Sequence, residues 1–191
     1  MTSPQIDSIH IFHNAEKYEY FINIAGIGIS SNIVQLKEKI PKWTPGALKY
    51  IVPTIGSVPA FKPLNLKISH DGGKMDAQTI ALFICNGQFS GGGMKFGPEA
   101  QLFDGLLNIT LIEKIPLHQL LLSLPKLYAG KIHKSRYIKT IQTKKITIHS
   151  EDAPGVELDG EFVGAGGFDI ELLPAVMPVC FPANSRNSLL G

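Results

Sequence analysis

Hydrophobic and polar residues alternate along much of this chain with a period of two, which indicates β-strands that have one buried face. The clearest case is residues 64–69, LNLKIS, where every second residue is apolar. Residues 107–111 and 168–172 follow the same pattern. The run at residues 79–85, TIALFIC, is apolar almost throughout and predicts a buried strand.

Three segments predict short helices instead. The first covers Ser31–Lys39, with its leading serine as a candidate N-cap. The second begins near Gly46 and carries apolar residues at helical spacing, although Pro53 is expected to kink it or end it early. The third begins at Leu117, and Gly130 is the expected stop signal.

Turns, rather than regular crossover helices, join most of the predicted strands. This arrangement is typical of antiparallel sheets, whereas a doubly wound parallel sheet needs a helix between successive strands. We therefore expect a mainly β fold: an antiparallel β-sandwich of two stacked sheets, with nine to twelve strands and two or three short helices. Residues 1–183 form the expected domain, and residues 184–191 form an expected flexible tail.

The composition supports a sizeable core and argues against a nucleic-acid partner. Hydrophobic residues make up 44% of the 191 residues. Charged residues make up only 18%, below the usual quarter, so we expect a partner domain or an apolar ligand to cover part of the surface. The 18 basic and 16 acidic residues give a net charge of +2, and no basic run is interleaved with aromatic residues. A phosphate-backbone footprint is therefore not expected.

The two cysteines, Cys85 and Cys180, lie in apolar runs without metal-type spacing, which fits a reducing compartment. The N-terminal residues show no secretory signal pattern. The most apolar helical stretch, Leu117–Leu127, is too short and too polar to span a bilayer. We expect a cytoplasmic protein, and peripheral contact with a membrane is left open.

Glycine is concentrated in a loop within residues 86–107, where Gly91–Gly93 are consecutive. Each glycine loses more backbone entropy on folding than any other residue, so the run calls for a reason. One explanation is positive φ angles or the close approach of a ligand or of another part of the backbone. A flexible surface turn is the alternative. Gly26 and Gly28, in contrast, predict a bulge or close packing, since a dinucleotide fingerprint needs a third glycine.

Acidic residues occur in two glycine turns: Asp104 precedes Gly105, while Asp159 and Glu161 flank Gly160. Carboxylates in such turns can hold Mg²⁺ or Ca²⁺ together with backbone carbonyls. They can also accept a proton from an attacking hydroxyl group. Ordinary turns have the same composition. The sequence contains no G-x-S-x-G elbow and no Walker-type loop, so nothing supports a serine or cysteine nucleophile.

These motifs together resemble a known family. The pattern N-x₄-GGGM-x₃-P-x-A-x₃-DGLLN at residues 86–108 resembles the C-terminal domain of the diacylglycerol/lipid kinase family, which includes sphingosine kinase and relatives of NAD kinase. Three further segments match the family and occur in the family's order: FINIAGIGIS at residues 21–30, the helix at residues 120–133 and LDGE at residues 158–161. The likeness covers nearly the whole chain.

The resemblance implies a role in phosphoryl transfer. Members of the family have an N-terminal lobe that binds the nucleotide and a C-terminal β-sandwich lobe, and they pass the ATP γ-phosphate to a lipid hydroxyl group. Glu161 matches the position of the proton acceptor for that hydroxyl, a role that phosphoryl transfer calls for. In some members of the family this turn contacts the nucleotide, so the resemblance makes Asp159 and Gly160 candidates for a contact with ATP.

The resemblance also implies a structural Mg²⁺ ion. Asp104 matches a side-chain ligand of that ion, and the positions of Gln101 and Leu106 match ligands that act through their backbone carbonyls. Asp104 would then hold the shape of its loop rather than take part in the chemistry.

The chain lacks the Gly-Gly-Asp-Gly-Thr signature of the nucleotide lobe. We therefore expect it to be inactive alone and to use ATP–Mg only when joined to that lobe, with a lipid bearing a free hydroxyl as substrate. A homodimer and a transient contact with a membrane surface are left open. Two alternatives remain: a non-catalytic module that binds lipid or protein through the apolar surface at residues 48–61, and a related small-molecule or NAD kinase.

Overall fold

The structure is a computed structural model that describes residues 5–13, 17–166 and 168–178. The predicted tail, residues 184–191, and Cys180 lie outside the described residues. Within them the chain forms fourteen strands and three α-helices, and every strand pair is antiparallel. The predicted fold class, a mainly β antiparallel sandwich with two or three short helices, is confirmed. The strands outnumber the prediction because two of them, in the glycine loop, are only two residues long.

Two six-stranded sheets form the sandwich. The strands of the first sheet, in spatial order, are β2 (Lys17–Phe21), β1 (Gln5–His13), β14 (Phe168–Pro178), β11 (Lys145–His149), β4 (Leu64–His70) and β5 (Gly73–Thr79). Those of the second sheet are β10 (Ile138–Thr143), β9 (Leu107–Ile112), β6 (Ala81–Cys85), β3 (Ile24–Gly28), β12 (Gly155–Leu158) and β13 (Glu161–Ala165). A small third sheet pairs β7 (Phe89–Ser90) with β8 (Met94–Lys95).

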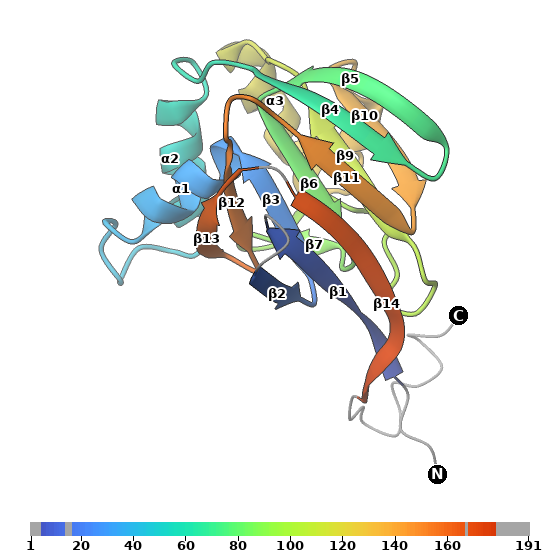
Figure 1. The fold of residues 1–191 in the computed structure, drawn as a ribbon. Helices are drawn as coiled ribbons and strands as arrows, with labels where there is room; N and C mark the ends of the chain where they lie inside the picture. Colours follow the sequence, from blue (N-terminus) through green and yellow to red (C-terminus); the bar gives the residue numbers. More distant parts are fainter. Residues whose placement is uncertain (1–4, 14–16, 167, 179–191) are drawn as a thin grey trace.

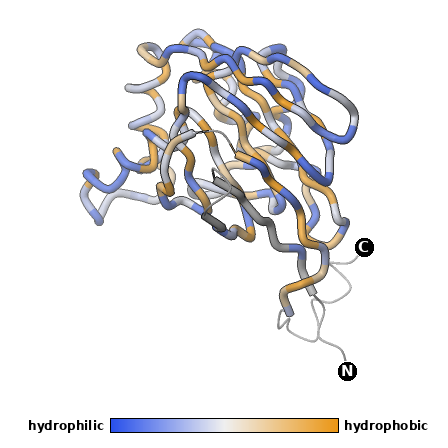
Figure 2. Tube along the Cα trace, viewed as in Figure 1, coloured by the Kyte–Doolittle hydropathy of each residue, from blue (hydrophilic) through white to orange (hydrophobic). Residues whose placement is uncertain are grey.

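The helices cover the outer face of the second sheet. They are α1 (Ile29–Lys37), α2 (Leu48–Ser57) and α3 (Leu117–Tyr128), and a short 3₁₀ helix, η1 (Ile132–Lys134), follows α3. Figure 1 shows α1 beside β3 and β12, with α2 next to it and α3 at the far end of the sheet. Figure 2 shows hydrophobic residues concentrated along the strands at the centre, with polar residues in the outer loops.

This arrangement creates two separate apolar layers. The first lies between the two sheets and is filled by the alternating residues of both, including Leu66 and Ile68 of β4. The second lies between the second sheet and the helices. β6 contributes to both, because Leu82 and Ile84 face the sandwich interior while Phe83 faces the helices. All five residues of β6 are therefore buried, as the apolar run predicted.

The start of α1 differs from the prediction. The helix begins at Ile29, and Ser31 lies inside it, where its hydroxyl donates to the carbonyl oxygen of Gly28 at 2.8 Å. The N-cap residue is Gly28, with a φ of 93°. A left-handed glycine at the end of β3 turns the chain directly into the helix, so a serine cap is not needed. A Cβ at this glycine would lie 2.7 Å from the carbonyl oxygen of Ile80, which confirms the predicted close packing.

The other two helices keep to the predicted regions. α2 contains Pro53 but continues to Ser57, so the proline does not end the helix early. The Thr54 hydroxyl donates to the carbonyl oxygen of Tyr50 at 2.6 Å, beside the site of the missing proline N–H. α3 ends at Tyr128, and Gly130 follows with a φ of 68°, which confirms it as the stop signal.

Candidate functional site: a helix-covered apolar cavity with an acidic end

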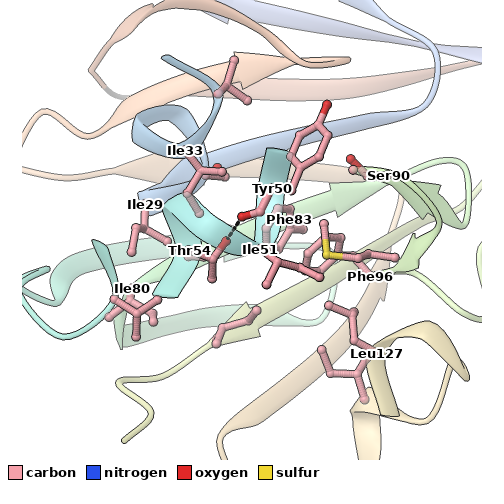
Figure 3. Close-up of a pocket in the computed structure, with 18 of the residues that line it drawn as sticks. Ile29, Ile33, Tyr50, Ile51, Thr54, Ile80, Phe83, Ser90, Phe96 and Leu127 are labelled. Atoms are coloured by element: carbon pink, nitrogen blue, oxygen red, sulfur yellow. Dashed lines mark hydrogen bonds between the residues drawn. The ribbon is translucent and has the colours of Figure 1, made fainter. Parts of the chain in front are cut away.

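A cavity of about 220 Å³ opens within the second apolar layer, between the second sheet and the three helices. The stacked rings of Phe83 and Phe96, with centroids 3.9 Å apart, form part of its lining. Figure 3 shows side chains of α1, α2, β6 and α3 converging on this space. Most lining residues are apolar; those from the helices include Ile29, Ile33, Val34, Ile51, Leu120, Leu124 and Leu127. Such a lining suits a hydrocarbon chain.

The cavity has one polar end. There it is lined by Asn23, Ser30, Glu157, Asp159 and Gly160, which come from three separate segments of the chain. The Asp159–Gly160 turn joins β12 to β13, the last pair of strands in the second sheet. The predicted acidic turn and an apolar cavity thus belong to one site, and an amphipathic ligand is what such a site can accommodate.

Asp159 holds the turn between β2 and β3. Its two carboxylate oxygens accept hydrogen bonds from the backbone N–H groups of Ile22, Asn23 and Ile24 at 2.9–3.0 Å. The N–H of Asp159 in turn donates to the carbonyl oxygen of Ile24 at 2.9 Å. Asp159 adopts a φ of 49°, which a short polar residue tolerates better than most. This carboxylate therefore has a structural task that the sequence analysis did not anticipate.

Asn86 continues this network toward the second acidic turn. It is fully buried, and its amide group donates to the carbonyl oxygens of Ile22 at 2.7 Å and Asp7 at 3.1 Å. Asp7 is also buried, and its carboxylate accepts the N–H of Gly105 at 2.9 Å. One chain of hydrogen bonds thus runs from the Asp159 turn to the Asp104 turn. Neither Asn86 nor Asp7 was predicted as a link between them.

The three consecutive glycines allow the helices to approach the loop. Gly91, Gly92 and Gly93 have φ angles of 52°, 79° and 102°, which confirms the expected positive values. A Cβ at Gly92 would lie 3.0 Å from the backbone nitrogen of Ala47, next to α2. Gly91 also lines the cavity. The run is therefore required both by its backbone angles and by close packing against the start of α2.

Lys37 connects α1 to the acidic turn. Its ammonium group donates to the carbonyl oxygen of Gly160 at 3.1 Å and to the hydroxyl of Tyr50 at 3.2 Å. The charge of Lys37 also lies over the Tyr50 ring, 5.2 Å from its centroid. This single side chain ties together α1, α2 and the turn, which fixes the polar end of the cavity against its apolar wall.

Glu157 is the most perturbed acid of the site. It is 4% exposed, and one of its carboxylate oxygens accepts the N–H of Gly160 at 2.8 Å. Burial raises the pKa of Glu157 to about 7, and the negative charge of Asp159 adds to the rise, while the Gly160 bond and the Lys37 charge oppose it. The sequence analysis missed this residue. Its alternation with Val156 and Leu158 placed it on the other face of β12, and only the structure reveals that α1 covers that face.

The structure places the proposed proton acceptor at the rim rather than inside. Glu161 is exposed at the first position of β13, next to Gly160, and the cavity lining formed by the described residues does not include it. Asp159 and Gly160 both line the cavity. The three residues of the acidic turn therefore differ in environment: Asp159 lines the cavity and is held by backbone N–H groups, Gly160 lines the cavity, and Glu161 is exposed.

Asp104 lies at a separate place. One of its oxygens accepts the N–H of Leu106 at 3.0 Å. Partial burial raises the pKa of the Asp104 carboxyl above its ordinary value, the Leu106 bond opposes this, and the nearby Asp7 raises it further. In the described part of the chain, no three His, Cys, Asp or Glu side chains are grouped to hold a metal ion. A cation here would therefore depend on backbone carbonyls, and it would relieve the repulsion between the two carboxylates.

The fold and the cavity define an antiparallel β-sandwich domain with a helix-covered, mainly apolar pocket. Residues 23–181 match the family described as the YegS C-terminal NAD kinase beta sandwich-like domain. Because that match spans most of the chain, the chain belongs to this family, and the lipid-kinase resemblance is confirmed at the level of the domain.

Named relatives agree with this assignment. The chain is 27% identical over 165 residues to a protein of Shewanella frigidimarina (strain NCIMB 400) named probable lipid kinase YegS-like, covering 86% of this chain and 53% of the relative. It is 24% identical over 149 residues to the diacylglycerol kinase of Bacillus subtilis (strain 168), covering 76% and 48%. The chain thus spans about half the length of these curated relatives.

A solved structure supports the fold. The crystal structure of a diacylglycerol kinase from Bacillus anthracis str. Sterne aligns with a TM-score of 0.61 at 18% identity, covering 94% of this chain and 54% of that one. No helix in the part of the chain that the structure describes is long and apolar enough to cross a membrane.

The raised pKa of Glu157 predicts a pH-dependent stability. The folded state holds the proton of Glu157 more tightly than the unfolded state, in which the side chain has its ordinary pKa of 4.5. The stabilisation from this proton is therefore complete below pH 4.5 and is lost as the pH rises through about 7. Between pH 5 and pH 8, we expect the free energy of unfolding in urea to fall by roughly 2–3 kcal/mol from this residue.

Glu157→Gln should remove most of that fall, because the amide stays neutral at both pH values and its carbonyl can still accept the Gly160 N–H. Glu151→Gln, at an exposed position, is the matched control and should leave the pH dependence unchanged. An equal fall in the wild type and in Glu157→Gln would contradict the assigned environment of Glu157.

Proposed function

We propose that this chain is the substrate-side lobe of an ATP-dependent lipid kinase of the diacylglycerol kinase type. Joined to an N-terminal nucleotide-binding lobe, it would receive a lipid that bears a free hydroxyl group and present that hydroxyl for phosphorylation. The observation that carries the proposal is the mainly apolar cavity whose lining includes the Asp159–Gly160 turn. The names of the relatives, lipid kinase and diacylglycerol kinase, agree with it.

The cavity fits the apolar part of such a substrate. Its walls are hydrocarbon and aromatic side chains, and burying a chain of methylene groups there stabilises a complex by about 0.8 kcal/mol for each group. The polar end then sets the lipid headgroup beside the turn that carries Glu161. The apolar wall thus lies at the helices, the polar end lies next to it, and the exposed acid lies at β13, the edge strand of the second sheet.

Glu161 is our candidate for the proton acceptor. It is exposed at the rim, so it can face both a bound lipid hydroxyl and an opposing lobe. ATP–Mg, held mainly by that lobe, would supply the phosphoryl group, and Asp159 and Gly160 are candidates for contacts with the nucleotide. Because Asp159 already binds three backbone N–H groups, its principal contribution is to fix the position of the turn.

The role of Glu161 can be tested in the chain joined to the nucleotide-binding lobe of a diacylglycerol kinase. Phosphate transfer from ATP to dioctanoylglycerol in mixed micelles is measured. Glu161→Gln should lower turnover by about 10²–10⁴-fold while leaving the melting temperature unchanged, because it removes the proton acceptor from an exposed position. Glu171→Gln, exposed on β14, should have no effect. Near-normal turnover of Glu161→Gln would remove Glu161 from the mechanism.

Asp104 is our candidate ligand for a structural Mg²⁺ ion, together with the backbone carbonyls of Gln101 and Leu106. The two carbonyls and the carboxylate come from one short loop, and oxygen is the ligand type that Mg²⁺ prefers. The raised pKa of Asp104, with Asp7 close by, is consistent with a site that becomes more favourable when a cation is bound.

Millimolar Mg²⁺ should therefore raise the melting temperature of the wild-type chain by a few degrees, as expected for a ligand that binds only the folded state. The rise should disappear in Asp104→Ala and persist in Asp76→Ala, an exposed acid on β5. An identical rise in both variants would exclude a magnesium site at Asp104.

A membrane surface is the proposed location at which the lobe collects its substrate. Residues 36–62, with α2, and residues 114–136, with α3, carry ten of the 18 basic residues and only one of the 16 acidic residues. Both segments also expose apolar side chains, among them Trp43 (85% exposed), Val52 (58%) and Leu122 (64%). Apolar residues among lysines are suited to the interface of an anionic membrane.

Co-sedimentation with vesicles tests this face. The wild-type chain should bind vesicles containing phosphatidylserine more tightly than vesicles of phosphatidylcholine alone. Val52→Asp should weaken the binding by about tenfold, because it puts a charge where an apolar group would be buried. Val176→Asp, at a position 50% exposed on β14, is the matched control and should bind as the wild type does. Equal loss in both variants would contradict a specific docking face.

The same assay bears on the alternative, a non-catalytic lipid-binding module. That alternative would be favoured if this chain bound vesicles but showed no kinase activity when joined to the nucleotide-binding lobe.

A further inference from the structure

We propose that Lys37 and Glu157 are positioning residues for Glu161: they bind the two peptide groups that flank Gly160 and thereby fix the place of the acid that follows it. This inference rests on the proposed function, in which Glu161 accepts the proton of the lipid hydroxyl. It adds to that function the two side chains that aim Glu161, and both act through the backbone rather than on the reacting atoms.

Glu161 needs such support because the hairpin alone holds it loosely. It is exposed at the first position of β13, and in the part of the chain that the structure describes β13 is an edge strand paired with β12. The turn between these strands consists of Asp159 and Gly160, with φ angles of 49° and 90°. Glycine adopts many backbone conformations at little cost, so a fixed geometry here calls for partners outside the turn.

Both peptide groups that flank Gly160 have such partners. The Gly160 N–H belongs to the peptide group shared with Asp159, and it donates to Oε2 of Glu157 at 2.8 Å. The Gly160 carbonyl oxygen belongs to the peptide group shared with Glu161, and it accepts a hydrogen bond from the Lys37 ammonium at 3.1 Å. Because a peptide group is planar, a bond to its oxygen also restrains the nitrogen and Cα of the next residue. Lys37 therefore restrains the backbone of Glu161.

The two positioning side chains come from different layers of the fold. Glu157 is 4% exposed on β12, between β3 and β13 of the second sheet. Lys37 ends α1, and its second hydrogen bond, at 3.2 Å to the Tyr50 hydroxyl, ties it to α2. A Cβ at Gly160 would lie 3.2 Å from the Lys37 nitrogen, so the turn fits closely under the ammonium group. The turn is thus fastened to the sheet by one bond and to the helices by the other.

The two positioning groups also interact through their charges. Burial raises the pKa of Glu157 to about 7 and the Asp159 carboxylate adds to the rise, whereas the Lys37 charge lowers it. The Cys85 thiol on β6 is a further ionisable neighbour. Burial raises the pKa of that thiol well above its ordinary value, and the Glu157 charge raises it further, so the thiol stays neutral near pH 7. The protonation of Glu157 therefore reports on the presence of the Lys37 charge.

The kinetic test uses the chain joined to the nucleotide-binding lobe of a diacylglycerol kinase, with dioctanoylglycerol in uncharged mixed micelles. Lys37→Met keeps the length of the side chain but removes the donor. It should lower kcat by about 10–100-fold and change KM for ATP and for dioctanoylglycerol by less than about threefold, because a displaced proton acceptor affects the transition state rather than binding. Lys67→Met, at an exposed position on β4, is the matched control and should leave both constants unchanged.

Conservative variants should rescue the activity. Lys37→Arg keeps a charged donor, and its kcat should stay within about fivefold of the wild type. Glu157→Gln keeps an acceptor for the Gly160 N–H and should behave likewise, whereas Glu157→Leu removes the acceptor and should lower kcat as Lys37→Met does. Equal kcat values in Glu157→Gln and Glu157→Leu would overturn the role of Glu157.

A double-mutant cycle separates positioning from a general structural effect. Added to Glu161→Gln, Lys37→Met should lower turnover by less than about twofold, because no proton acceptor is left to place. The same loss with and without Glu161 would overturn the positioning role and leave the proposed function intact. Near-normal turnover of Glu161→Gln, or a joined chain without kinase activity, would overturn the proposed function and this inference with it.

Nuclear magnetic resonance of the 191-residue chain alone gives a test without kinase activity. The chemical shift of the Gly160 amide proton should titrate with a midpoint near pH 7, because Glu157 accepts that N–H. Lys37→Met should move the midpoint to higher pH, since it removes the positive charge that lowers the pKa of Glu157. Lys67→Met should leave the midpoint unchanged. A Gly160 amide that does not titrate, or a midpoint that Lys37→Met leaves in place, would overturn the inference.

Discussion

The carboxylate of Asp159 is the interaction on which the site depends. By accepting three backbone N–H groups from residues 22–24, it fastens the turn after β12 to the turn that leads into β3. A carboxylate with several backbone donors is a strong and directional anchor, because charge-assisted hydrogen bonds are about twice as strong as neutral ones. The same turn carries Gly160, which meets both Lys37 and Glu157. Without this anchor, the polar end of the cavity would have no fixed geometry.

The cavity exists because the second sheet has two apolar faces, only one of which packs against the other sheet. Its outer face is covered by short helices rather than by a flat layer of strands, and helices laid on a sheet leave space between them. Glycine makes that cover possible at two places. Gly28 turns β3 directly into α1, and Gly92 lets the start of α2 approach the glycine loop. Both positions have positive φ angles and little room for a side chain.

Charge is distributed as unevenly as apolar surface. The near-neutral total of +2 conceals two basic segments, residues 36–62 with α2 and residues 114–136 with α3, and a remainder that carries 8 basic and 15 acidic residues. Residues of both segments line the cavity, whereas the acids of the site lie at its polar end. A balanced composition argued against a nucleic-acid footprint, but it did not reveal that the basic residues are concentrated in these two segments. Only the fold shows that both segments, with α2 and α3, lie over the outer face of the second sheet.

Local pattern determined the strands, the turns and the stop of α3, because alternation and glycine act over a few residues. It also located Asp104, Asp159 and Glu161, since an acid beside glycine is visible in the sequence. It misplaced the start of α1, because a left-handed Gly28 replaced the side-chain cap. It did not reveal the roles of Glu157, Asn86 or Asp7. Their roles arise from contacts between distant segments, as in the bond from the Ala175 N–H to the Asp7 carboxylate, 168 residues apart in the chain. The burial of Glu157, and with it the pKa of its side chain, depends on which element packs against its face of β12. The spacing of hydrophobic residues along the sequence does not show this.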